Sequence, residues 1–271
     1  MIALILEPFK FHFINNALLM LLVVTIPCAL LSVFIVSKGW ALTGGGVSHA
    51  ILPGVVLAWI MGMPLSIGGF LAGIFCAVAT GYLKNNTQLK PDTIMGIVFS
   101  GMTSVGLMLY IFVQPKVDVN YVLFGDILVL TGGEIIKTAI VMGAVLLVVL
   151  LKRRDFLAYC FDSQQAHACG LHTNLLHYSL LCLISLTIVE TLKAVGVVLS
   201  VSLLITPGAV VVLLTKNFNF ALLAAVIVSI LTSMAGVYLS FFIDSAPSPT
   251  IVVVFAVVFI TSLVISTSKI R

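Results

Sequence analysis

The sequence predicts an all-α integral membrane protein, a polytopic bundle of eight to nine transmembrane helices. Of its 271 residues, 61% are hydrophobic and only 8% are charged, whereas an ordinary soluble domain has about 25% charged residues. Apolar segments long enough to cross a bilayer follow one another over nearly the whole chain. A water-soluble enzyme is therefore excluded, and we expect residues 1–271 to form a single transmembrane domain.

Nine candidate spans are found, each with roughly the 20 apolar residues that cross a hydrocarbon core about 30 Å thick. In chain order they lie at about 16–37, 46–61, 65–83, 93–113, 133–151, 174–192, 194–214, 219–243 and 249–267. The second is short and contains Gly44-Gly45-Gly46 and Pro53-Gly54, so we expect its helix to be broken over residues 42–54. A re-entrant or half-length helix among the nine would reduce the count to eight.

The basic residues predict the orientation of the chain. An N-terminus outside the cell places nine of the 13 Lys and Arg residues on one side of the membrane and four on the other. The nine are Lys38, Lys84, Lys90, Lys152, Arg153, Arg154, Lys216, Lys269 and Arg271. Because cytoplasmic loops carry an excess of basic residues, the side with nine is predicted to be cytoplasmic. The same residues are dispersed along the chain and form no patch for nucleic acid.

The longest polar segment runs from Lys152 to His172 and is cytoplasmic in this orientation. Asp162 is placed to cap a short helix and Gly170 to end it, so we expect an amphipathic helix of about two turns. Two interpretations follow from the residues. The segment is either a solvated loop with a capped turn or a helix whose apolar face docks in a groove of a separate soluble partner.

Ionisable residues inside a span are costly to bury and are functional candidates for that reason. His49, beside Ser48 in the second span, is the clearest case. A neutral imidazole is a ligand for first-row divalent metals, but a histidine bonded to backbone groups freed by the nearby glycines is equally consistent with the sequence. His167, His172 and His177 recur every five residues, a spacing that does not suit a shared metal on one helix face, and are expected to be surface or interface histidines.

Pro207 interrupts the seventh span, because proline removes a helical hydrogen bond and clashes with the preceding turn. A static kink is one interpretation. The other is that Thr206 and Pro207 line the translocation path or flex with it, as discontinuous helices do in many transporters.

Four segments, taken in order, resemble the permeases of metal-type ABC importers. They are KGWALTGGGVSHAILPG at 38–54, LFGDIL at 123–128, FDSQQAHACGL at 161–171 and VGVVLSVSLLITPGA at 195–209. The resemblance implies a type II ABC importer fold in a bacterial inner membrane and the uptake of zinc, manganese or chelated iron, with the manganese and iron branch nearest. It also implies partners: a second permease, identical or a paralogue, two cytoplasmic ABC ATPases, and an extracellular or periplasmic metal-binding protein.

The resemblance further implies residue roles. His49 matches a histidine that is a ligand of the metal path, with Ser48 beside it. The segment at about 152–172 matches the region that couples to the ATPase, and the residues assigned to coupling are Phe161, Asp162, Ala166 and Gly170. The transported metal is a substrate, and no permanently bound cofactor is expected.

The sequence departs from this family at Gly45, where the family pattern has an aspartate one helical turn before the histidine. Glycine supplies no side-chain ligand, so half of the expected pair is missing. Three explanations remain open: an altered or weakened site, a carboxylate supplied by a partner chain, or a variant that has lost function.

Other functional classes lack their residues. The sequence contains no GxxxxGK[ST] motif, so we expect a non-catalytic subunit and ATP hydrolysis by a partner chain. The alternative is a stand-alone secondary metal transporter or channel, which would need buried charge for ion coupling. His49 is the only ionisable residue well inside a predicted span. An intramembrane enzyme would need a nucleophile with its base or an HExxH helix, and neither is found.

Overall fold

The computed structural model describes residues 12–88, 91–113, 132–215 and 217–270. Within these ranges the regular elements are all helices, which confirms the predicted all-α class. They are α2 (His12–Ser37), α3 (Ala41–Ala50), α4 (Leu52–Ile60), α5 (Leu65–Asn86), α6 (Pro91–Val113), α8 (Gly132–Leu151), α9 (Arg153–Phe161), α10 (Ser163–Ala168), α11 (Thr173–Leu214), α12 (Phe218–Ile243) and α13 (Pro247–Ile270). The LFGDIL segment at 123–128 lies outside the described residues.

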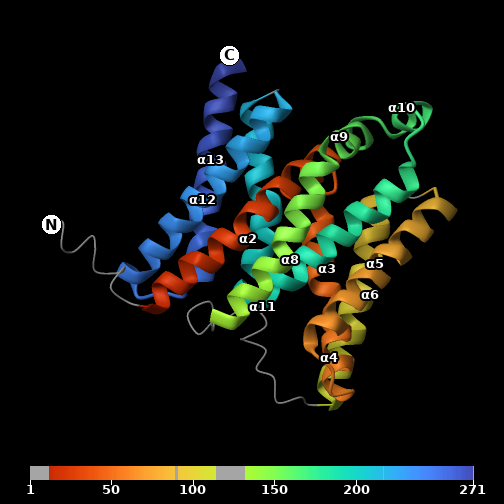
Figure 1. The fold of residues 1–271 in the computed structure, drawn as a ribbon, viewed down its shortest axis with the longest axis horizontal. Coiled ribbons are helices and arrows are strands. Elements are labelled where there is room, and N and C mark those ends of the chain that lie inside the picture. Colours follow the sequence, from red (N-terminus) through yellow and green to blue (C-terminus); the bar gives the residue numbers. More distant parts are fainter. Residues whose placement is uncertain (1–11, 89–90, 114–131, 216, 271) are drawn as a thin grey trace.

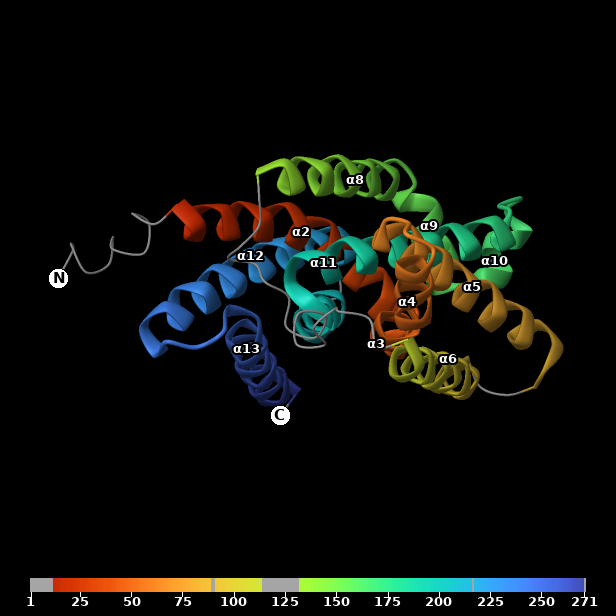
Figure 2. The ribbon, with the colours of Figure 1, turned by 90° about the horizontal axis from the view of Figure 1, so that it is seen from below.

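Helices α2 and α11 form the centre of the bundle. Helix α11 packs against α2, α3, α5 and α13, and the fully buried side chains include Phe34 of α2 and Ile184 of α11. Figures 1 and 2 show the pair α12 and α13 on one side of this centre and α3 to α6 on the other. The predicted metal-path residue His49 therefore belongs to the group of helices that lies opposite α12 and α13.

The predicted count of eight to nine transmembrane helices is not confirmed. In the described part of the chain, six helices are long and apolar enough to cross a membrane, and two shorter apolar helical stretches lie at Ser48–Ile60 and Ile67–Leu83. The sixth and seventh predicted spans are joined in α11, whose 42 residues would measure about 63 Å if the helix were straight.

A bend at Gly196 divides α11. This residue has φ of 80° and ψ of 173°, a conformation that glycine adopts and other residues rarely do. The Ser248 hydroxyl donates to the carbonyl of Val195, next to the bend, at 3.0 Å. The bend lies close to the boundary predicted between the sixth and seventh spans, so α11 consists of two helical segments that meet at Gly196.

The interruption predicted within residues 42–54 is confirmed, but it does not lie at the three glycines. Helix α3 runs through all three glycines, and the interruption lies at Ile51, where α3 ends and α4 begins with Pro53 in its first turn. Tertiary packing outweighs the weak helix propensity of glycine here, because a Cβ at Gly46 would overlap the ring of Phe99 in α6.

The short helix predicted in the polar segment is confirmed as α10. The Asp162 carboxylate caps it by accepting hydrogen bonds at 2.8 and 3.0 Å from the backbone N–H groups two and three residues later. Gly170, with φ of 82°, follows its C-terminus, and the next backbone N–H donates to the Ala166 carbonyl at 3.1 Å. Both ends thus use local capping chemistry. Figure 1 shows α9 and α10 together at one end of the bundle.

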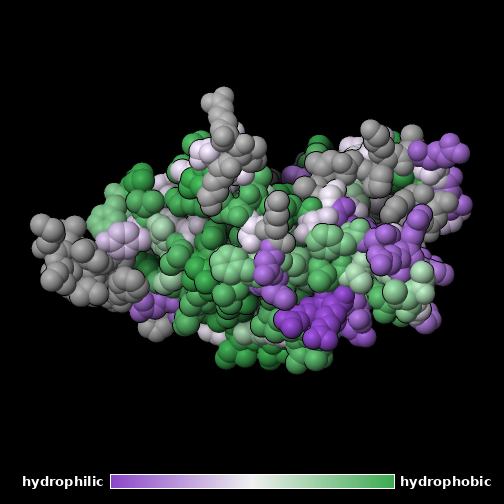
Figure 3. Space-filling view, turned by 90° about the horizontal axis from the view of Figure 1, so that it is seen from above, coloured by the Kyte–Doolittle hydropathy of each residue, from purple (hydrophilic) through white to green (hydrophobic). Residues whose placement is uncertain are grey.

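The surface agrees with a membrane environment. Large apolar side chains are exposed along whole helices, as with Met108, Ile111 and Phe112 of α6, and soluble monomers rarely expose contiguous apolar patches of this kind. On the face seen in Figure 3, apolar side chains dominate and hydrophilic ones gather toward one end.

Candidate functional site

Helix α3 places the two residues of the predicted metal path differently. Ser48 is buried, with 2% of its surface exposed, whereas His49 is exposed. Within the described ranges no hydrogen bond or ion pair involves the His49 imidazole. A histidine that satisfied backbone groups freed by the glycines would be bonded to them, so the geometry favours a ring that is presented to a ligand or to another chain.

Gly45 lies one helical turn before His49 in the same helix, which places both residues on one face. A Cβ at Gly45 would lie 3.6 Å from Val201 Cγ1 of α11, an ordinary van der Waals distance. Packing therefore does not require glycine at this position, in contrast to Gly46. The space around this position therefore does not explain why glycine stands where the resemblance implies an aspartate.

A complete metal centre is not formed by the described residues alone, which contain no group of three or more His, Cys, Asp or Glu side chains able to hold an ion. A metal at His49 would take its remaining ligands from water or from another chain.

Helix α11 continues through Pro207, and the bend within it lies at Gly196 instead. Ser32 Oγ of α2 accepts a hydrogen bond from the Gly208 N–H at 2.7 Å and donates to the Ile205 carbonyl at 3.1 Å. The buried backbone groups beside the proline are thus satisfied within the protein, as membrane burial demands.

The two predicted path residues of this helix differ in exposure: Pro207 is buried and Thr206 is half-buried. In the described part of the chain, no hydrogen bond joins either of them to His49.

The structure brings the four predicted coupling residues into one unit. Phe161 ends α9 with 69% of its surface exposed, and Ala166 is buried beneath α10. The ring of Phe161 lies edge-on to that of Phe218, with centroids 6.1 Å apart. Asp162 and Gly170, which define the two ends of α10, are exposed. The unit presents an apolar ring beside polar groups at one end of the bundle.

Sequence reasoning missed a set of contacts at this end, formed by Lys38, Trp40, Tyr159 and His177 and named here the junction cluster. The Lys38 ammonium donates to the Tyr159 carbonyl at 2.7 Å, and the Tyr159 hydroxyl is hydrogen-bonded to His177 Nδ1 at 2.8 Å. The Trp40 and His177 rings meet edge-on at 5.1 Å. Burial raises the pKa of the Tyr159 hydroxyl, so this group keeps its proton.

Of the three histidines predicted to be surface or interface residues, His167 and His172 are exposed and His177 is half-buried. The other three members of the junction cluster are Lys38, Trp40 and Tyr159. Lys38 and Tyr159 are 121 positions apart in the sequence. No spacing in the sequence relates them, and their placement outside the apolar runs was the sole available signal.

Glu190 is a buried carboxylate in α11, with 7% of its surface exposed. Lys193 Nζ, three residues further along the helix, lies 2.7 Å from one of its oxygens and forms an ion pair with it. The Thr138 hydroxyl of α8 donates to the other oxygen at 3.1 Å. Because both oxygens are engaged and the charge is paired, Glu190 is a structural residue rather than an available metal ligand.

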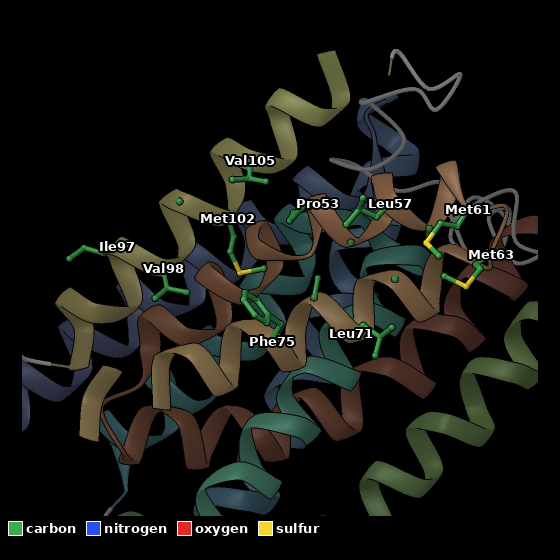
Figure 4. Close-up of a pocket in the computed structure, with 15 residues that line it drawn as sticks. Pro53, Leu57, Met61, Met63, Leu71, Phe75, Ile97, Val98, Met102 and Val105 are labelled. Carbon is green, nitrogen blue, oxygen red and sulfur yellow. The ribbon is translucent and has the colours of Figure 1, made fainter. Parts of the chain in front are cut away.

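A groove of about 610 Å³ lies between α4, α5 and α6. Figure 4 shows the side chains that line it, among them Leu57, Phe75 and Met102. The lining residues carry no charge, so the groove does not suit a hydrated divalent cation. Pro53, which also lines it, follows His49 by one turn, so the apolar groove adjoins the exposed histidine.

Comparisons with known proteins extend over nearly the whole chain. The model of the ABC 3 transport family matches residues 10–266. A "probable iron transport system membrane protein" of Haemophilus influenzae is 45% identical over 267 residues, which cover 98% of each chain. The chelated iron transport system membrane protein YfeD of Yersinia pestis is 47% identical over 262 residues, covering 97% of this chain and 88% of the relative.

A manganese transport protein and a solved structure give similar matches. The manganese transport system membrane protein MntB of Synechocystis is 40% identical over 258 residues, covering 95% of this chain and 84% of the relative. A chain in the structure of PsaBC from Streptococcus pneumoniae in complex with Fab is 32% identical, with a TM-score of 0.86 and coverage of 97% of this chain and 95% of that chain. The likeness therefore covers the full bundle.

Proposed function

This chain belongs to the ABC 3 transport family, and on that premise we propose that it is the transmembrane permease subunit of an ATP-driven importer for manganese or iron. The observation that carries the proposal is its likeness, over nearly its full length, to membrane proteins named for iron and manganese transport. Zinc is the further candidate, because imidazole suits zinc and iron alike and manganese less well.

The metal passes His49 during alternating access between the two sides of the membrane. Two copies of this chain, or this chain and a paralogue, enclose the path. This arrangement is supported by the exposure of His49 and by the adjoining apolar groove, which offers a surface for a second subunit. A partner chain can then supply the oxygen ligand that Gly45 lacks.

Energy for the cycle comes from a cytoplasmic ABC ATPase that docks on α9 and α10. The exposed Phe161 ring and the capped helix α10 form a compact surface for such a partner, of the kind used in helix-in-groove recognition. An extracellular or periplasmic metal-binding protein delivers the metal at the opposite end. The permease is a multi-pass protein of the inner membrane and catalyses no reaction itself.

Transport is tested with the permease, its ATPase and its binding protein together in proteoliposomes. We expect ATP-dependent uptake of manganese(II) or iron(II), and a large loss of uptake in His49→Ala with the ATPase still bound. His172→Ala is the matched control, because His172 is an exposed histidine outside the spans. Uptake against a gradient by the permease without the ATPase would refute the proposal and favour a stand-alone transporter.

Docking is tested by co-purification with the ATPase. Asp162→Lys removes the cap of α10 and reverses its charge, and Gly170→Leu forces a branched residue to adopt a φ of 82°; both are expected to weaken the complex. Asp162→Asn is the control, since asparagine is an equally good N-cap, and it should bind normally. Unchanged assembly of all three variants would count against docking at α10.

A further inference from the structure

Helix α10 is connected to the bundle through few neighbours. It packs on α9 and on the start of α11, and Ala166 is its buried side chain. A partner that displaces α10 therefore acts on the rest of the molecule through α9 and through the first turns of α11. Two residues of the junction cluster, Tyr159 and His177, lie on these two elements.

The junction cluster joins α9 and α11 to the turn between α2 and α3. Lys38 follows the last residue of α2 and Trp40 precedes the first residue of α3. The Lys38 ammonium meets the last turn of α9 at the Tyr159 carbonyl, where a cation also favours the helix dipole, and lies 4.2 Å from the centre of the Tyr159 ring. Trp40 contacts both the Tyr159 ring, at 6.4 Å, and the His177 ring.

The central contacts of the junction cluster are buried. Tyr159 and Trp40 expose 4% and 3% of their surfaces, so water cannot readily replace a hydrogen bond that is lost there. A small polar cavity of about 140 Å³ adjoins the cluster and is lined by Lys38, His177 and Ser163, the first residue of α10. The cavity gives α10 room to move relative to the cluster.

Helix α3 transmits such a displacement to the metal path. It begins directly after Trp40 and is regular from Ala41 to Ala50, and Gly46 is fitted closely against Phe99 of α6. Movement at the Trp40 end therefore shifts α3 as a unit, together with Gly45 and His49.

Resting on the proposed function, we propose that the junction cluster is the positioning link through which movement of α10 displaces α3 and His49. Tyr159 is its central residue, because its carbonyl, ring and hydroxyl each contact a different member of the cluster. The cluster touches neither the metal nor the nucleotide and acts through α3.

The test uses Tyr159→Phe in the complete transporter in proteoliposomes. This variant keeps the ring and the carbonyl and removes only the hydroxyl that bonds His177. ATP hydrolysis and the uptake of manganese(II) and iron(II) are measured in the same vesicles. We expect hydrolysis close to that of the wild type, with metal taken up per ATP reduced about two- to tenfold, the effect of one hydrogen bond. Tyr178→Phe is the control, because Tyr178 lines the small polar cavity beside the cluster and its ring lies 5.3 Å from that of His177. In this variant the amount of metal taken up per ATP should stay unchanged.

An unchanged ratio in Tyr159→Phe, or a parallel fall in hydrolysis and uptake, overturns the inference. If this variant does not assemble, Lys38→Met is measured in the same way, and an unchanged ratio there overturns it equally. Absence of ATP-dependent uptake by the wild-type transporter would instead be a failure of the proposed function, so the two failures are distinguishable.

Discussion

Gly45→Asp is expected to create a metal-binding pair with His49. In α3 the two positions are one turn apart, which separates their Cβ atoms by about 5–6 Å. A carboxylate oxygen and an imidazole nitrogen that both bind one metal at about 2.0–2.2 Å lie roughly 3 Å from each other, and both side chains are long enough to meet this condition. The new side chain has space, because the nearest atom to a Cβ at Gly45 is Val201 Cγ1 at 3.6 Å.

The expected gain in affinity is at least about tenfold, or about 1.4 kcal/mol. Removal of a partner in the outer shell of a metal site already costs 10- to 100-fold in affinity, and a direct ligand contributes no less. Stability should hardly change, since aspartate is only about 0.3 kcal/mol better than glycine within a helix. Any large effect on metal binding is then an effect on the site rather than on folding.

The assay is a double-mutant cycle on the purified permease in nanodiscs. Isothermal titration with manganese(II), iron(II) and zinc(II) is carried out on the wild type, Gly45→Asp, His49→Ala and the double variant, with Gly45→Asn as an uncharged control. We expect Gly45→Asp to tighten binding only where His49 is present, which gives a coupling free energy of about 1 kcal/mol or more. Equal tightening in the presence and absence of His49 would refute a shared site, and a gain confined to one metal would identify the substrate.

Three further outcomes are expected. Gly46→Ala should destabilise the fold by about 1–3 kcal/mol, because its Cβ would overlap the buried ring of Phe99. Gly45→Ala should be tolerated, since a Cβ there has ordinary contacts. Thermal unfolding in detergent distinguishes the two variants, and equal melting temperatures would contradict the prediction. Ser32→Ala should cost about 1–3 kcal/mol by leaving the Gly208 N–H without its acceptor, measured in the same way, while Ser32→Thr should retain part of that stability. Exposed Cys169 should react with a maleimide far faster than buried Cys160, because burial raises the pKa of the Cys160 thiol to about 12. The reaction rate of Cys160 should keep rising with pH well above pH 9. Equal rates for the two cysteines at pH 7 would show that this part of α9 opens.

Features that depend on neighbouring residues in the chain were predicted correctly. Asp162 and Gly170 were expected to bound a short helix, and they do so through hydrogen bonds that span only a few residues. The Glu190 and Lys193 pair is likewise local, because the two residues are only three positions apart in one helix. Local geometry fixes such contacts whatever the rest of the fold.

Features that depend on distant residues were not predictable. The glycine run was expected to break its helix, but Phe99 of α6 packs against Gly46 and the helix continues. The contact of Ser32 with the backbone beside Pro207 joins residues 176 positions apart. Nothing in the sequence neighbourhood of His177 indicates Tyr159 as its partner.

By itself, the sequence determined that the chain is a helical membrane protein, where most of its helices lie and which family it resembles, because these properties follow from long apolar runs and from motifs read along the chain. Tertiary structure decided which side of each helix is covered. In a membrane helix the side that faces lipid is as apolar as the side that faces the core, so no polar face in the sequence distinguishes them. The exposure of His49, the free space at Gly45 and the contacts between Tyr159 and its partners therefore became known only when the helices were seen packed together.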